Sequence, residues 1–162
     1  MTELHVTALS PDRLAALRSR GTDDLGNRIE KIAAGGGEPL RCCLRRARPG
    51  ESIAVISYSP FTTRSPWTEV GPVLVHHDEC AGHPDSQALP DELRTGPRVL
   101  RTYHADGSLD YDDITLASDG LDIEPVLREL LDRPRVARVH VRTVLPQCFL
   151  YEVHAQPADT ST

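Results

Sequence analysis

The fold of this chain is decided by the stretch RCCLRRARPGESIAVISYSPFTTRSPWTEVGPVLVHHDEC, residues 41–80. It holds three of the four cysteines, two of the seven histidines and the one tryptophan of the 162-residue chain. Residues 40–45 alternate, which predicts a strand whose neighbouring side chains point to opposite faces. Residues 52–58 are apolar on both faces and predict a central, doubly covered strand. Residues 70–77 predict the next strand, so the reactive side chains are concentrated around two or three adjacent strands.

The segment before this stretch predicts one short strand and one helix. Residues 5–9 are a candidate strand, and Ser10 is placed to cap a helix that has Pro11 at its first position. Gly21 is placed to end that helix. Residues 22–34 fit either a helix or a turn followed by a strand, because apolar residues at helical spacing surround the turn signal Gly26-Asn27.

The segment after residue 80 predicts further strands and the clearest helix. Asp106-Gly107 lies between the runs 98–104 and 108–111 and predicts a hairpin. Residues 123–131 carry apolar side chains at helical spacing, with Asp119 or Asp122 as the cap. Residues 137–143 and 149–153 predict the last strands. The expected fold is therefore α+β, with a curved antiparallel sheet of about six or seven strands and two or three helices packed on it.

Composition narrows the class of protein. Apolar residues make up 39% of the chain and charged residues 26%, as in globular proteins. The net charge of −6, without a basic block, argues against nucleic acid as a partner. We expect no membrane span and no signal peptide, and hence a cytoplasmic protein whose cysteines are thiols or metal ligands. We expect one domain over residues 1–155 and a frayed tail over 156–162.

Two cysteines and a histidine suggest thiol chemistry. On a strand, Cys42 faces the leucines as a core thiol, and Cys43 faces Arg41 and Arg45, whose charges would lower its pKa. Cys43 as a nucleophile and His76 as its base would form a catalytic pair. The main interpretation contains no metal. In the alternative, Cys43, His76, Cys80 and Cys148 form a Cys₃His set for zinc.

Arginines and a histidine suggest an anion site. Arg41 and Arg45 share one face of their predicted strand, and the stripe at Arg138, His140 and Arg142 shares one face of another. Arginine forks suit carboxylate or phosphate. Solvated faces held by surface ion pairs are the simpler alternative for both stripes.

Four sequence blocks carry a resemblance to a known family. They are RCCLRRARPGE (41–51), SYSPF with SPWTEVGP (57–72), VHHDEC (75–80) and VHVRTVLPQCFLYEV (139–153). With these blocks the chain resembles the bacterial family known as domain of unknown function 1203, over roughly residues 39–153. The resemblance implies no activity. The family's recurring positions correspond here to Arg41, Cys43, Tyr58, Phe61, Glu69, Gly71, Pro72, His76, Cys80, Arg142 and Cys148. The chain departs from the family at Trp67, where tyrosine is usual, and at 145–147, where a turn with glycine is usual.

These observations predict a binding protein for a small anionic molecule in a sheet-lined pocket. Its expected ligand-binding residues are Arg41, Tyr58, Phe61, Trp67, Cys80, His140, Arg142 and Cys148. One alternative is an enzyme that uses Cys43 and His76, and another is a structural zinc or protein-interaction module. The sequence leaves open whether the chain is an enzyme, which cofactor it holds, and whether it is a monomer or a homodimer.

Overall fold

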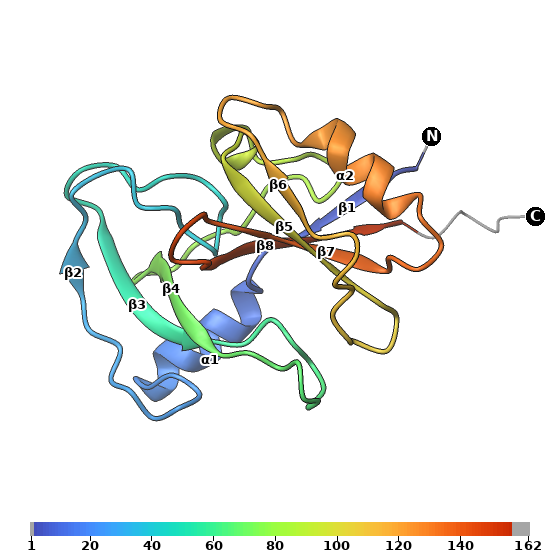
Figure 1. Ribbon diagram of the computed structural model, residues 1–162. Helices are drawn as coiled ribbons and strands as arrows, with labels where there is room; N and C mark the ends of the chain where they lie inside the picture. The colour runs from blue at the N-terminus through green and yellow to red at the C-terminus, as the bar shows by residue number, and fades with distance from the viewer. Residues whose placement is uncertain (1, 157–162) are drawn as a thin grey trace, which may run out of the picture.

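Two antiparallel sheets, rather than one, carry the fold (Figure 1). The computed structural model describes residues 2–156. In this part of the chain, five strands form a sheet in the order β1-β8-β7-β5-β6, and three form a sheet in the order β2-β3-β4. The predicted α+β content is correct, with mostly sheet and two α-helices. The prediction of a single curved sheet of six or seven strands is wrong, because the long connection from β4 to β5 contains only one 3₁₀ turn, Asp91–Leu93, and no strand that joins the sheets.

The five-stranded sheet comes from both ends of the chain. Its strands are β1 (Leu4–Thr7), β5 (Arg98–Tyr103), β6 (Thr115–Ala117), β7 (Arg138–Arg142) and β8 (Phe149–Ala155). The hairpin tip at Asp106-Gly107 is confirmed by the hydrogen bond that the backbone N–H of His104 donates to the carbonyl of Ser108, 2.9 Å. Its second arm, however, makes only one bridge, and β6 follows later.

Helix α2 (Glu124–Leu131) packs on this sheet. Asp122, one of the two predicted caps, accepts a hydrogen bond from the backbone N–H of Glu124. Leu127 and Leu130 are buried against Val139 and Val141 of β7, together with residues of β8. The apolar spacing therefore identified both the helix and its buried face.

The three-stranded sheet consists of β2 (Ile32–Ala33), β3 (Ser52–Tyr58) and β4 (Gly71–His76). Helix α1 (Pro11–Arg20) begins after the Ser10 cap, ends at Gly21 with φ of 77°, and buries Leu14 and Leu17 in the same core. Residues 22–34 form a turn followed by β2, which is one of the two predicted alternatives. The expectation that both faces of β3 are buried is wrong at Val55, which is 51% exposed.

The predicted strand over residues 40–45 is instead a tight turn. The backbone N–H of Leu44 donates to the carbonyl of Leu40, 3.0 Å, and the N–H of Leu40 donates to the carbonyl of Arg45, 2.9 Å. Leu44 has a φ of 59°, in the left-handed region. Alternation no longer applies, so Cys42 and Cys43 need not point to opposite faces.

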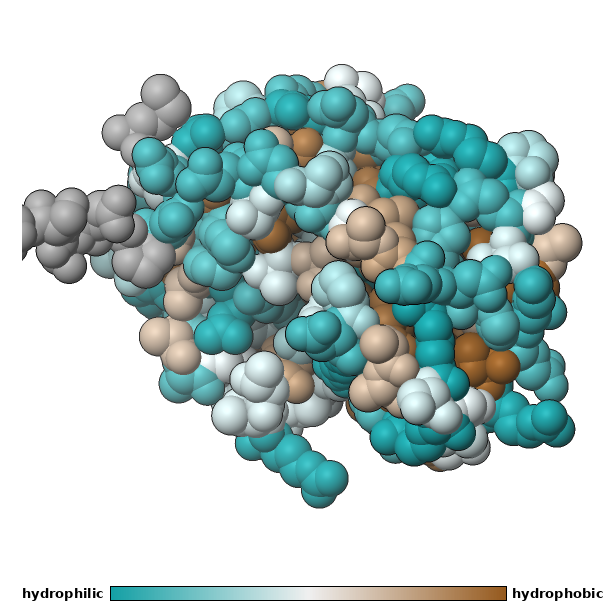
Figure 2. Space-filling view, turned by 180° about the vertical axis from the view of Figure 1, so that it is seen from behind, coloured by the Kyte–Doolittle hydropathy of each residue, from teal (hydrophilic) through white to brown (hydrophobic). Residues whose placement is uncertain are grey.

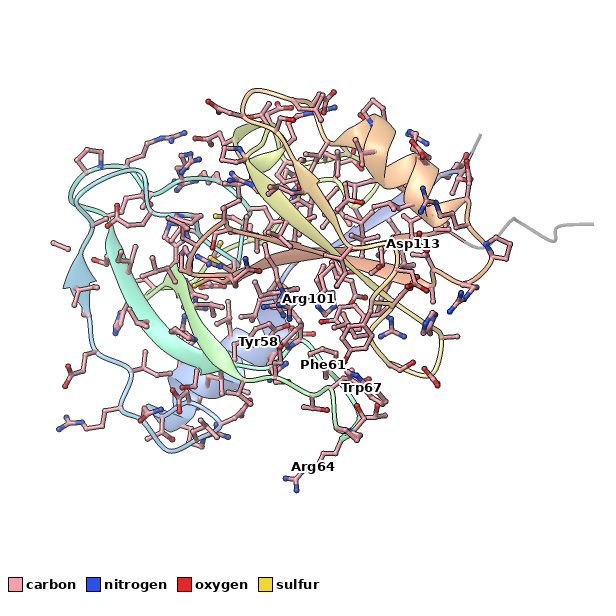
Figure 3. The ribbon with its side chains drawn as sticks, in the orientation of Figure 1. Tyr58, Phe61, Arg64, Trp67, Arg101 and Asp113 are labelled. Carbon is pink, nitrogen blue, oxygen red and sulfur yellow. The ribbon has the colours of Figure 1, made fainter. Side chains whose placement is uncertain are left out.

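Aromatic side chains fill the space where the two sheets meet. Tyr58 packs on Phe149, and Phe61 packs on Tyr103 and His140. Figure 3 shows Tyr58, Phe61 and Trp67 along the segment that leaves β3, with Arg64 directed away from the molecule. The polar face of β7 is therefore covered, and the alternative of a solvated face does not hold for His140 and Arg142, which are buried.

The remaining surface is mixed in character. Figure 2 shows hydrophobic residues on the side of the three-stranded sheet, broken up by hydrophilic ones. No helix within residues 2–156 has the length and apolar character needed to cross a membrane. Of the expected frayed tail, Gln156 is described, and its backbone N–H donates to the carbonyl of Glu3. The rest of that tail, residues 157–162, lies outside the described part of the chain.

Candidate metal centre

Three thiols and one imidazole converge beside the end of β4. Cys42 and Cys43 lie on the turn 40–45, His76 is the last residue of β4, and Cys80 lies in the segment that follows it. One ligand atom from each residue, three Sγ and one imidazole nitrogen, lies within 4.8 Å of all the others. Cys42 is buried and the other three are partly buried. This cluster could bind a metal ion.

Hydrogen bonds fix the segments that carry these side chains. The backbone N–H of Arg41 donates to the carbonyl of Leu74, 2.9 Å, and ties the turn to β4. The backbone N–H of His76 donates to Cys42 Sγ, 3.3 Å. From helix α1, the guanidinium of Arg18 donates to the carbonyls of His76 and His77, at 3.0 and 2.9 Å. The end of β4 is thus held on both sides.

The distances within the cluster resemble the edges of a coordination tetrahedron. Zinc–sulfur bonds of about 2.3 Å and zinc–nitrogen bonds of about 2.0 Å give tetrahedral edges of about 3.5–3.8 Å. Cys42 Sγ lies 3.4 Å and Cys43 Sγ lies 3.8 Å from His76 Nδ1. The two sulfurs are 4.0 Å apart. A small tetrahedral ion would need only slight movement of Cys42, Cys43 and His76.

Glu51 and Arg45 contact the imidazole of His76 at Nε2, the nitrogen that faces away from the thiols. His76 Nε2 lies 2.6 Å from Glu51 Oε2, so Nε2–H donates to the carboxylate and Nδ1 is left free to accept or to coordinate. Both oxygens of Glu51 also accept from Arg45, each at 2.9 Å, which holds the pKa of Glu51 well below its usual range. Carboxylates that orient a metal-binding histidine in this way are typical of zinc sites.

The vicinal thiols differ in acidity. The hydrogen bond from Cys42 lowers the pKa of Cys43, and the backbone N–H of Arg45, the His76 ring and the Arg45 guanidinium lower it further. Cys42 is the donor in this hydrogen bond, so the bond raises the pKa of Cys42, and burial raises it further. Cys43 is therefore the thiolate of the pair, and a thiolate is the form that binds metals and attacks electrophiles.

Comparison with known proteins identifies the family but not a function. Residues 37–155 match the model of the family described as Protein of unknown function (DUF1203). The chain belongs to this family. The matched segment contains all four cysteines, His76 and Glu51. Neither a search of curated proteins nor a search of solved structures found a match.

The cluster of this DUF1203 chain differs from the predicted metal set in one residue. Cys43, His76 and Cys80 come together, but Cys42 takes the place predicted for Cys148. Cys148 Sγ lies near the carbonyl of Pro146 instead, on the loop between β7 and β8. The predicted burial of Cys42 in the core is correct, since it is 1% exposed. The sequence interpretation missed Cys42 as a ligand, because a strand would have directed it away from Cys43. It also missed Glu51, for which the sequence holds no specific signal.

Apart from Cys80, which belongs to the cluster, the predicted anion-binding residues do not form one pocket with it. Tyr58, Arg142 and Cys148 line a separate cavity of about 330 Å³. The guanidinium of Arg41 donates to the carbonyl of Phe149, 2.7 Å, on the wall of that cavity. Phe61 and His140 are packed in the aromatic group, where His140 Nε2 lies 2.9 Å from Glu152. Trp67 donates from Nε1 to the hydroxyl of Tyr111, 3.0 Å.

Proposed function

We propose that this DUF1203 chain binds one zinc ion through Cys42, Cys43, His76 and Cys80. The observation that carries the proposal is the convergence of three Sγ atoms and one imidazole nitrogen of His76, all within 4.8 Å of one another. Three sulfurs and one nitrogen suit zinc, whereas magnesium and calcium prefer oxygen ligands.

The role of the ion is structural. All four coordination positions come from the protein, whereas catalytic zinc sites keep one position open for water or substrate. Three of the four ligands come from segments without regular structure, the turn 40–45 and the loop after β4, and His76 ends β4. The ion would join the turn 40–45 to the end of β4 and to the segment that follows it.

A cysteine-dependent enzyme is the second candidate. Cys43, His76 and Glu51 are arranged as a nucleophile, its base and a carboxylate that orients the base. Cys43 and Arg45 also line an open cavity of about 490 Å³. However, Cys42 Sγ is closer than Cys43 Sγ to the same Nδ1, at 3.4 against 3.8 Å. A nucleophile–base pair requires one thiol and does not account for the other two, so zinc is favoured.

Metal analysis of purified protein tests the proposal. We expect one zinc per chain in the wild type and a large loss of zinc in Cys43→Ser and Cys80→Ser. Cys148→Ser is the matched control, because it removes a thiol outside the cluster, and it should retain the metal. Replacement by cobalt should produce the visible absorption of a tetrahedral site and the near-ultraviolet charge-transfer band of thiolate ligands.

Two outcomes would overturn the zinc assignment. One is a wild-type protein that holds no zinc, cobalt or other metal after reconstitution under reducing conditions. Selective alkylation of Cys43 in that metal-free protein, abolished in His76→Ala, would then support the enzyme instead. The other is equal loss of metal in Cys148→Ser and Cys43→Ser, which would place the ion elsewhere.

A further inference from the structure

A second site lies in the cavity where the two sheets meet. Its walls come from the end of β3, the start of β4, strand β5 and the loop between β7 and β8. Polar groups from Glu69, Arg101, Arg142 and Cys148 share these walls with the rings of Tyr58 and Phe149. Figure 3 shows Tyr58 and Arg101 close to the junction of the sheets. At about 330 Å³ the cavity has the size of a small-molecule site.

Arg142 is the most deeply placed charge in this cavity. Only 6% of its surface is exposed. Its guanidinium donates to the carbonyl of Gln147 and to Glu69 Oε2, each at 2.8 Å. Its buried Nε–H has no hydrogen-bond partner among the described residues. An unpaired buried donor on a charged group is costly and calls for a partner.

Positive charge exceeds negative charge around the cavity. Glu69 is the partner of both Arg142 and Arg101, whose guanidinium lies 2.8 Å from Glu69 Oε1. Arg41, behind the wall at Phe149, is 3% exposed and donates to the carbonyls of Phe149 and Pro39. Within residues 2–156, two guanidinium groups at the cavity wall therefore share the carboxylate of Glu69, and a third, that of Arg41, lies behind the wall.

Such an excess is unusual in a protein with a net charge of −6. Buried charges are normally paired, because moving an unpaired charge from water into the protein interior costs several kcal/mol. The acidic residues of the chain are numerous, yet among the described residues 2–156 Glu69 is the one acidic side chain that lines the cavity. The arrangement leaves room for an anion that comes from outside the chain.

We propose that this cavity binds a small organic anion, with a carboxylate or phosphate group against Arg101 and Arg142 and an apolar body against Tyr58 and Phe149. Arginine forks recognise both anionic groups. The aromatic and proline residues of the wall supply the apolar contact that small-molecule sites require. This site is separate from the proposed zinc centre and does not depend on it.

Cys148 provides a reporter inside the cavity. Iodoacetate and iodoacetamide alkylate a thiol by the same reaction but differ in charge, so the ratio of their rates at Cys148 reports the local potential. Mass mapping isolates Cys148 from the other thiols. We expect a higher iodoacetate-to-iodoacetamide ratio at Cys148 than at glutathione.

Two variants should move this ratio in opposite directions. Arg101→Gln removes one cation and should lower the ratio of the rates by about threefold or more. Glu69→Gln removes the competing carboxylate and should raise the ratio by a similar factor. Both magnitudes follow from the short-range Coulomb effect of one charge with partial screening. A general disturbance of the fold would move both variants the same way. Equal ratios in all three proteins, or a shift in one common direction, would overturn the proposal.

A matched pair of ligands tests binding in the unaltered protein. Benzoate and benzamide have nearly the same shape, but only benzoate carries a charge. At constant ionic strength, benzoate should raise the melting temperature with increasing concentration and slow the alkylation of Cys148 by iodoacetamide, and benzamide should do neither. The same effects from inorganic phosphate but not from benzoate would support the anion site and assign it to phosphate compounds. No effect from either anion, or equal effects from benzoate and benzamide, would overturn it.

Discussion

Replacement of Glu51 by glutamine tests whether the residues around the proposed zinc ligands support His76 as a ligand. The carboxylate accepts from His76 Nε2 at 2.6 Å and from both terminal nitrogens of Arg45. In Glu51→Gln the histidine loses a charged partner. The positive Arg45, which lies 3.3 Å from the same Nε2, loses its compensating charge. Both effects make His76 a weaker metal ligand.

The expected loss is substantial but not complete. Removal of such a supporting partner lowers metal affinity by about 10- to 100-fold, which corresponds to about 1.4–2.8 kcal/mol. All four direct ligands remain, so the variant should still bind zinc at saturating concentration. Competition with a chromophoric chelator at one fixed pH measures the change, because zinc displaces thiol protons and its affinity rises with pH.

Glu92→Gln is the matched control for this experiment. It makes the same chemical change in a carboxylate that pairs with Arg48 and contacts none of the four ligands. We expect its zinc affinity to stay within about twofold of wild type, as for surface ion pairs in general. If Glu51→Gln behaved like Glu92→Gln, the hydrogen bond from His76 would not support a metal ligand and the reasoning would fail.

Two further predictions concern stability. Leu130→Ala should lower the free energy of unfolding by about 2–5 kcal/mol, because it opens a cavity beneath α2. The exposed Leu116→Ala should stay within about 0.5 kcal/mol, and urea denaturation that found equal costs would contradict the packing of α2. Asp23→Ala should cost about 1–3 kcal/mol at neutral pH, since the Asp23 carboxylate accepts from three backbone N–H groups in the turn before β2 and in β3. Burial alone would raise the pKa of Asp23, but these hydrogen bonds lower it. Its contribution is therefore present above the unfolded pKa and is lost as pH falls through the folded one, so the difference between wild type and variant should shrink in acid; a difference that grew in acid would contradict this.

Local signals predicted the elements of the fold better than their arrangement. The Ser10 cap and Gly21 defined α1, and the spacing of apolar residues defined α2, because each signal acts within a few residues. The division into two sheets depends instead on strand partners far apart in sequence. Leu4 of β1 pairs with Ala155 of β8, and an alternation pattern does not identify which distant strand is the partner. The alternation along the chain therefore predicts a single sheet, whereas the strands belong to two.

The cysteine and histidine cluster shows the same limit within the six residues 40–45, where a local pattern did not identify the turn. Leu40 and Leu44 are buried in the observed turn, as they would be in a strand, so their spacing fits both structures. The turn places Leu44 in the left-handed region without the glycine or asparagine that would have predicted it. This conformation costs about 1–2 kcal/mol for an ordinary residue and persists only where its surroundings favour it. Burial of Leu44 and the hydrogen bond from Arg41 to β4 favour the turn, and zinc bound to both Cys42 and Cys43 would stabilise it further, since a strand would direct the two thiols apart.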